Sequence, residues 1–160
     1  GLAESTGMSR QDARVFIDKY LERFSGVRDY MLKTKQLARE QGYVETLLGR
    51  RRYLPEITSG GFRGRAASER EAINHPIQGT AADIMKLAML KVNALSKGML
   101  AGAKLLLQVH DELLFEVPKD QVSKVAPEIK AAMASAFKLA VPLEVDLSTG
   151  PNWGALKKLF

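Results

Sequence analysis

Apolar side chains near the start of the chain recur at the spacing of an α-helix, with polar positions between them. Ser9 opens the first helical pattern in a context like that of a capping box, and the pair Ser25 and Gly26 ends it. A second pattern runs over residues 27–41 and stops at Gly42, a residue type common just after a helix. The two patterns predict a helical hairpin.

A short β-ribbon is expected next. Residues 43–47 and 52–54 have the composition of two strands, and Gly49 lies in the connection between them. Pro55 follows the ribbon, and residues 58–64 combine three glycines with polar side chains. We expect that segment to be a flexible loop that serves as a hinge.

The middle of the chain predicts two helical segments separated by a proline. The first covers residues 66–74, Pro76 interrupts it, and a longer amphipathic helix resumes over residues 78–95. Lys97 and Gly98 are the expected end of this second helix.

Two apolar runs, residues 104–109 and 113–117, lie on either side of a short polar cluster. The cluster consists of His110, Asp111 and Glu112. Two apolar runs with so short a polar connection predict an antiparallel β-hairpin with a very tight turn.

The last part of the chain predicts one more helix and one more strand. The helix is expected over residues 119–139 despite Pro127, and a closing strand with alternating polar positions over residues 143–147. Strands and helices without a regular β-α-β alternation favour the α+β class, with an antiparallel sheet that carries the hairpin and is backed by helices.

Composition narrows the class of protein. Hydrophobic residues make up 46% and charged residues 26% of the 160 residues, values close to globular averages, so one folded domain or a piece of one is expected. The net charge of +6 favours a polyanionic partner such as nucleic acid. No cysteine, secretory signal or long apolar run is present, which favours the cytoplasm. The first residue is not Met, so we expect a chain that was processed or cut from a longer one.

The polar cluster between the apolar runs is the sharpest candidate for chemistry. Carboxylates on the turn of a rigid hairpin, here Asp111 and Glu112, suit a hard divalent cation such as Mg²⁺. Adjacent turn residues point in different directions, so a site for two metal ions needs another carboxylate, for which Asp83 and Asp146 are candidates without a telling spacing. The alternative is that the cluster is only a polar turn.

A second candidate is a block of arginines, whose planar guanidinium groups suit contacts to phosphate. The block consists of Arg50, Arg51, Arg52, Arg63, Arg65 and Arg70. A solvated face or salt bridges between helices would explain it equally well. Asn74 and Gln78 lie four residues apart beside Pro76, where amides could meet acceptors in a nucleic-acid groove or could simply cap helices.

Together these pieces resemble the C-terminal part of the family A DNA polymerases, the bacterial DNA polymerase I group. Residues 108–112 look like motif C of the polymerase palm, and Arg70 to Asn74 with residues 76–83 look like the helical segment that precedes it. Further stretches occur in family order, at residues 42–46, 49–53, 141–143 and 152–153. The resemblance spans essentially the whole chain.

The resemblance implies a metal-dependent reaction. Asp111 would be one of two aspartates that hold a catalytic pair of Mg²⁺ ions, Glu112 would be an accessory carboxylate, and His110 would lie near the primer terminus. The implied reaction is attack of a primer 3′-hydroxyl on the α-phosphorus of a dNTP, with release of pyrophosphate.

The resemblance also implies a nucleic-acid partner. Arg70, Asn74 and Gln78 would contact primer-template DNA near the active site, at minor-groove acceptors that all correct base pairs share. Residues Arg50 to Arg52 would contact backbone phosphates. The resemblance places the enzyme with the bacterial nucleoid in the cytoplasm.

Two domain portions follow from the resemblance, a helical hairpin from the fingers at residues 1–42 and the C-terminal part of the palm at residues 43–160. The first metal-binding aspartate, the nucleotide-binding helix and the thumb lie upstream of the matching region in the family. The chain alone is therefore expected to be inactive and to need an N-terminal polymerase fragment as partner. A non-catalytic primer-template-binding module and an inert fragment remain the alternatives.

Overall fold

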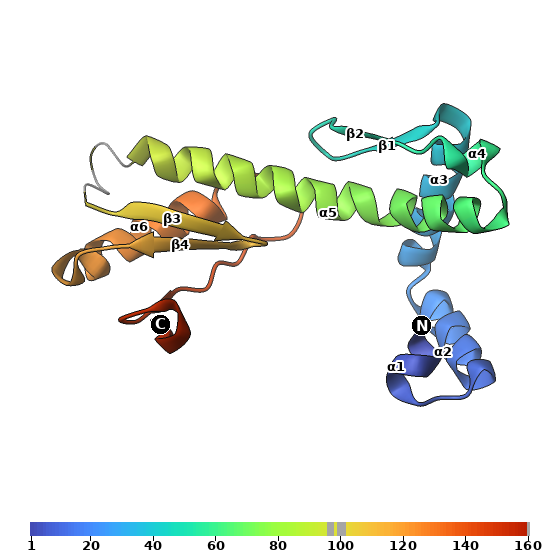
Figure 1. Cartoon of the computed structure of the whole chain (residues 1–160), viewed down its shortest axis with the longest axis horizontal. Helices are drawn as coiled ribbons and strands as arrows, with labels where there is room; N and C mark the ends of the chain where they lie inside the picture. Colours follow the sequence, from blue (N-terminus) through green and yellow to red (C-terminus); the bar gives the residue numbers. More distant parts are fainter. Residues whose placement is uncertain (96–97, 99–101, 160) are drawn as a thin grey trace. The chain divides into compact units, whose positions relative to one another are not determined.

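The computed structural model describes residues 1–95, 98 and 102–159. The chain forms two compact units, Gly1–Ile77 and Gln78–Phe160, and the boundary falls inside the long helix α5 (Phe62–Leu95). Helices and short antiparallel strands together confirm the α+β class (Figure 1). The strands form three separate two-stranded sheets within the described residues, where one antiparallel sheet was expected. The boundary predicted after residue 42, between portions of the fingers and the palm, differs from this division and stays a prediction.

The first unit opens with α1 (Leu2–Thr6), α2 (Arg10–Arg23) and α3 (Ser25–Gln41). The hydroxyl oxygen of Ser9 accepts a hydrogen bond from the Asp12 amide at 3.1 Å, which confirms the predicted start of α2.

The break between α2 and α3 lies at Phe24, whose φ of −108° and ψ of 62° are not helical. Ser25 and Gly26 belong to α3, so the expected break at these two residues is wrong. Glycine at the start of a helix is free to adopt the helical conformation, and it does not force a stop. Gly42 ends α3 with a φ of 78°, as its position predicted.

Strands β1 (Tyr43–Glu45) and β2 (Arg51–Tyr53) form the expected ribbon, with Val44 paired to Arg52. The flexible loop expected at residues 58–64 is wrong, because α4 (Glu56–Ser59) and the start of α5 occupy most of it. Burial explains the difference, since α4 contributes to a compact apolar cluster. That cluster consists of Ala38, Val44, Leu54, Ile57 and Ala72.

Helix α5 is continuous through Pro76, so the expected interruption there is wrong. A proline inside a helix loses one hydrogen bond and crowds the preceding turn. Packing offsets that loss: Ser68 and Ala72, within the two turns before Pro76, are buried. The expected end of the helix at Lys97 lies outside the described residues, and Leu95 is the last helical residue described.

The second unit contains the hairpin of β3 (Lys104–Val109) and β4 (Glu112–Glu116), followed by the short 3₁₀ helix η1 (Lys119–Gln121) and α6 (Val122–Ala134). Side chains from α5 and α6 pack together in its core, with Phe115 of β4 against them. The buried members are Val92, Val125, Ile129 and Ala132. The hairpin is thus backed by helices, as predicted.

The C-terminal segment differs most from the sequence-based expectation. Helix α6 ends at Ala134, five residues before the predicted end at residue 139, with Ser135 as its cap. Residues 143–147 alternate between partly buried and exposed but form no strand; they have no ladder partner among the described residues. The last pair of strands is β5 (Ser148–Thr149) with β6 (Lys157–Lys158), and the 3₁₀ helix η2 (Trp153–Ala155) lies between them in the chain.

Among the helices that the structure describes, none has both the length and the hydropathy needed to cross a lipid bilayer.

Candidate functional site

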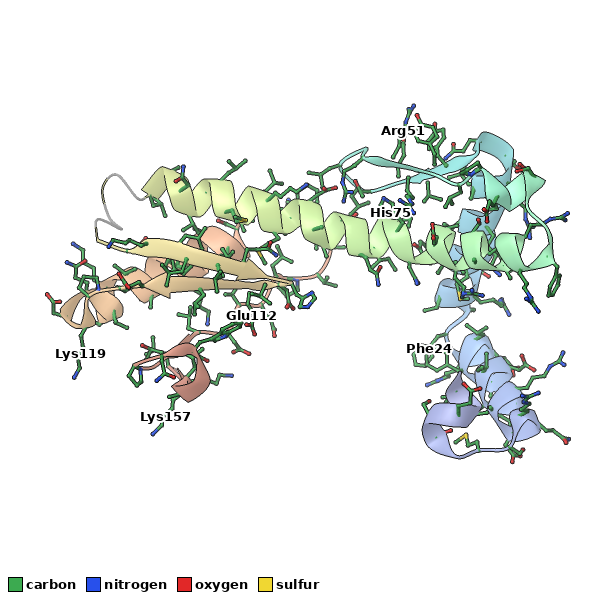
Figure 2. The ribbon with its side chains drawn as sticks, viewed as in Figure 1. Phe24, Arg51, His75, Glu112, Lys119 and Lys157 are labelled. Atoms are coloured by element: carbon green, nitrogen blue, oxygen red, sulfur yellow. The ribbon has the colours of Figure 1, made fainter. Side chains whose placement is uncertain are left out.

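The turn between β3 and β4 consists of two residues, His110 and Asp111, because Val109 pairs directly with Glu112. The polar connection is therefore shorter than the expected three residues, and Glu112 is the first residue of β4 (Figure 2). His110 has a φ of 52°, the positive value that two-residue hairpin turns require at their first central position. The chain follows this geometry without a glycine.

A hydrogen bond from a side chain to the backbone stabilises the turn. The Gln108 amide nitrogen donates a hydrogen bond to the carbonyl oxygen of His110 at 2.6 Å. Because this bond closes over the turn, it fixes the peptide that precedes Asp111. The sequence pattern included Gln108 in the motif but carried no signal for this hydrogen bond to the turn.

Asp111 and Glu112 are exposed, and neither forms a salt bridge within the described part of the chain. At the opposite end of the same hairpin Lys104 Nζ lies 3.5 Å from Glu116 Oε1, so carboxylates elsewhere on the hairpin do have cationic partners. The carboxylates at the turn are therefore open to a ligand from outside.

The donor chemistry at the turn fits a hard cation in part. Asp111 and Glu112 offer the carboxylate oxygens that Mg²⁺ prefers. Across residues 1–95, 98 and 102–159, however, no cluster of three or more His, Cys, Asp or Glu side chains could hold a metal ion.

Arg70 and Asn74 lie one turn apart on α5 in the first unit, and both are exposed. Gln78, four residues further along the same helix, is exposed and opens the second unit. Because α5 continues through Pro76, neither Asn74 nor Gln78 caps a helix end. The capping explanation of these two amides is therefore wrong.

The β1–β2 ribbon holds the three consecutive arginines in different environments. Arg51 projects from the ribbon (Figure 2). Its Nε lies 2.7 Å from Glu45 Oε1, and its guanidinium lies 4.5 Å from the centre of the Tyr43 ring. The hydrogen bond from Arg51 to Glu45 raises the pKa of its guanidinium above the ordinary value. Arg52 pairs with Glu71 at 3.1 Å.

Salt bridges engage Arg51 and Arg52, but they join β2 to β1 and β2 to α5, whereas the alternative explanation expected salt bridges between helices. Arg50 is exposed, and its amide donates to the Thr46 hydroxyl at 3.1 Å in the turn of the ribbon. The aromatic partner of Arg51 was missed; the tyrosines in the two predicted strands, Tyr43 and Tyr53, were the signal that could have found it.

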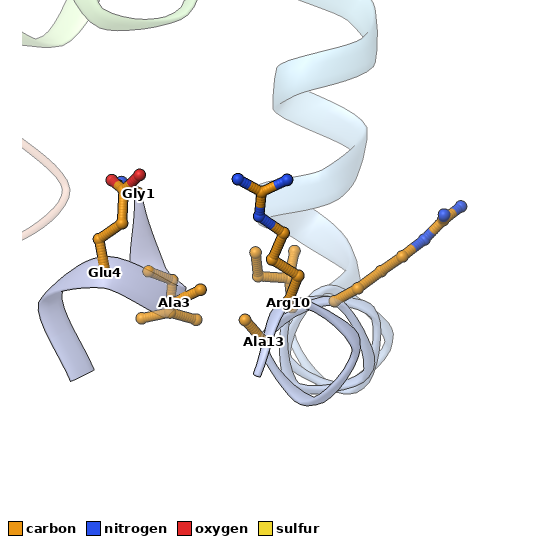
Figure 3. A pocket seen from close by; sticks show the side chains of 8 residues that line it. Gly1, Ala3, Glu4, Arg10 and Ala13 are labelled. Carbon is orange, nitrogen blue, oxygen red and sulfur yellow. The ribbon is translucent and has the colours of Figure 1, made fainter. Parts of the chain in front are cut away.

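A pocket of about 420 Å³ lies between α1 and α2, with Arg10 at its edge (Figure 3). The terminal ammonium of Gly1 pairs with Glu4 beside it. None of the residues predicted to bind metal or DNA lines this pocket, so it is separate from the candidate site.

Comparison with known proteins places these features in one family. A family model described as DNA polymerase family A matches residues 1–155. DNA polymerase I of Bacillus subtilis (strain 168) is 49% identical over 153 residues, and that of Pseudomonas aeruginosa is 50% identical over 153 residues. Each alignment covers 96% of this chain and 17% of the relative.

A solved structure has the same fold. It is described as the POL domain of Pol1 from M. smegmatis in complex with DNA primer-template and dNTP, and it matches with a TM-score of 0.85 and 46% sequence identity. The match covers 90% of this chain and 25% of that one. Because the family match extends over nearly all of the described residues, the chain belongs to DNA polymerase family A.

Proposed function

We propose that this chain is the C-terminal part of a DNA-directed DNA polymerase and contributes one half of a two-metal nucleotidyl-transfer site. The observation that carries the proposal is the position of Asp111 in the turn of the hairpin, which the Gln108 hydrogen bond stabilises. The Asp111 side chain is exposed and has no cationic partner in the described residues. Membership of the family supports the same reading, as does a neighbour of known structure described with primer-template and dNTP.

In this proposal Asp111 holds metal through its carboxylate, and Glu112 is an accessory carboxylate beside it. Bound Mg²⁺ ions would activate the primer 3′-hydroxyl and neutralise the leaving pyrophosphate. The Gln108 bond to the His110 carbonyl keeps Asp111 in place. The His110 side chain is assigned a place near the primer terminus.

DNA binding is assigned to the exposed polar residues of α5 and of the β1–β2 ribbon. Arg70, Asn74 and Gln78 present donors to the primer-template duplex, and Arg50 to Arg52 face its phosphates. Donors placed at acceptors that every correct base pair shares would check pairing without reading sequence.

The chain is proposed to need a partner that supplies the first metal-binding aspartate, the nucleotide-binding helix and the thumb. The support is that no cluster of three or more metal-ligating side chains occurs in the described residues. The same observation favours a second candidate, a primer-template-binding module without catalysis of its own.

Primer extension separates the candidates. The assay uses Mg²⁺, dNTPs and a labelled primer-template with the chain alone, and with the chain mixed with a separately expressed N-terminal fragment of a family A polymerase. Extension on mixing only supports the split metal site. Extension by the chain alone contradicts the need for a partner, and DNA binding without extension in either case supports the binding module.

A further inference from the structure

Pro76 creates a weak point in α5 next to a proposed DNA contact. Proline has no amide hydrogen, so the carbonyl of Ala72 lacks the donor that an ordinary helix would supply, and the ring crowds the turn before it. Ile73 and Asn74 belong to this turn. Asn74 is exposed, so its position depends on how firmly the turn is held.

A tyrosine on another helix fastens that turn. The Tyr30 hydroxyl of α3 donates a hydrogen bond to the carbonyl oxygen of Ile73 at 2.8 Å, across 43 residues of sequence. The bond is partly buried, and burial raises the pKa of the Tyr30 hydroxyl, while a hydrogen bond with the Thr34 side chain acts in the opposite direction. The hydroxyl therefore stays protonated and remains a donor at neutral pH.

Three further interactions described between α3 and α5 lie before Ile73 in the sequence of α5. Lys35 and Arg39 pair with Glu69, which lies one turn before Ile73. Ala38 and Ala72, neither of them exposed, belong to the same apolar cluster. These contacts reach Glu69 and Ala72, whereas the Tyr30 bond reaches Ile73, the residue directly before Asn74.

We propose that Tyr30 is a positioning residue for primer-template binding, and that it acts by fastening the α5 turn that carries Asn74. The proposal rests on the function proposed for Asn74. The proposed role requires the hydroxyl group of Tyr30, because the ring of a phenylalanine would fill the same space without donating a hydrogen bond.

The first measurement is hydrogen exchange on the chain and on Tyr30→Phe. We expect the amide of Ile77, which lies one turn after Ile73, to exchange about fivefold faster in the variant, the loss expected for one hydrogen bond. Tyr20→Phe is the matched control, because Tyr20 lies on α2 and its hydroxyl has no hydrogen bond among the described residues. Equal exchange in Tyr30→Phe and Tyr20→Phe would overturn the proposal.

The second measurement is the affinity for primer-template in the polymerase formed by the chain and an N-terminal fragment. Tyr30→Phe should raise the Kd for DNA by up to about fivefold, since the effect is limited by the one bond lost, and leave the KM for dNTP unchanged. In the double variant with Asn74→Ala, Tyr30→Phe should add nothing to the effect of Asn74→Ala alone. Independent, multiplicative effects would overturn the proposal.

Failure of the premise gives a different result. If Asn74→Ala leaves the Kd for DNA unchanged, the DNA contact assigned to Asn74 is wrong. The positioning role proposed for Tyr30 is then wrong as well. Exchange at Ile77 would still report whether Tyr30 fastens the turn, so the two failures can be told apart.

Discussion

The chemistry proposed for this chain depends on the conformation of one residue. His110 takes a φ of 52°, and the next residue, Asp111, is the exposed carboxylate of the turn. A positive φ is unfavourable for residues with a side chain because the Cβ atom approaches the backbone. The β3–β4 turn adopts this unfavourable conformation. Because the turn has only two residues, it holds the Asp111 carboxylate directly beside two paired strands.

Removing the carboxylate should separate catalysis from binding. In the polymerase formed with an N-terminal fragment, Asp111→Ala should lower the rate of primer extension by at least about 10²-fold to 10³-fold, as expected when one electrostatic contact to a transition state is lost. The Kd for DNA should change by no more than a few-fold. Asp120→Ala, at an exposed acidic position of η1, is the control and should keep both. Near-normal turnover of Asp111→Ala would remove the metal assignment.

Substitutions of His110 test the strain directly. His110→Val should lose about 1–2 kcal/mol of unfolding free energy, because a β-branched side chain tolerates positive φ poorly. His110→Gly should stay within about 0.5 kcal/mol of the parent chain, because relief of strain is offset by greater freedom of the unfolded chain. Urea denaturation of both variants measures the difference. Equal stability of the two would show that the turn is not strained.

At the scale of elements, ion pairs tie α3 to the start of α5. Lys35 Nζ lies 3.0 Å from Glu69 Oε2, and Arg39 pairs with the other oxygen of the same carboxylate. Hydrogen bonds from Lys35 and then Arg39 lower the pKa of Glu69. The Glu69 side chain is 24% exposed, so the pairs are screened less than pairs at an open surface.

A lowered pKa makes the stabilisation by Glu69 dependent on pH. The contribution is present above the pKa of the unfolded chain and is lost as the pH falls through the lower pKa of the folded chain. Glu69→Gln should therefore cost about 1 kcal/mol at pH 7 and progressively less as the pH falls below about 4. Urea denaturation at pH 7 and pH 3 measures it, with Glu22→Gln on α2 as control. A difference that does not change with pH would contradict the ion-pair origin.

At the scale of the whole molecule, the net charge of +6 favours a polyanionic partner, and the response of DNA binding to salt tests for one. Each protein cation that neutralises a duplex phosphate releases counterions, and the affinity then falls with salt by a slope of about 0.9 per contact. The three arginines of the β1–β2 ribbon are the residues to which such contacts are assigned.

Salt dependence can count these contacts one by one. Arg50→Ala should reduce the slope of log K against log salt concentration by about one. Arg14→Ala on α2 removes the same charge at a position with no proposed DNA contact and should leave the slope nearly unchanged. Fluorescence anisotropy with a labelled primer-template at several salt concentrations gives both slopes. Equal slopes for the two variants would contradict a phosphate contact at Arg50.

Local signals in the sequence predicted the elements that depend on neighbouring residues. Ser9 and Gly42 marked helix ends correctly because a cap involves atoms within one helical turn. The two apolar runs predicted the β3–β4 hairpin. Asp111 lies in its two-residue turn, and the sequence also predicted it in the polar turn. Family membership also followed from these motifs and is confirmed by the family match.

Tertiary structure decided what depends on residues far apart in the chain. Pro76 predicted an interruption of α5, but burial of Ala72 keeps the helix continuous. The alternation over residues 143–147 predicted a strand, yet a strand also needs a partner, and none forms among the described residues. Helix and turn signals are local, whereas burial and strand pairing are settled only when the chain has folded.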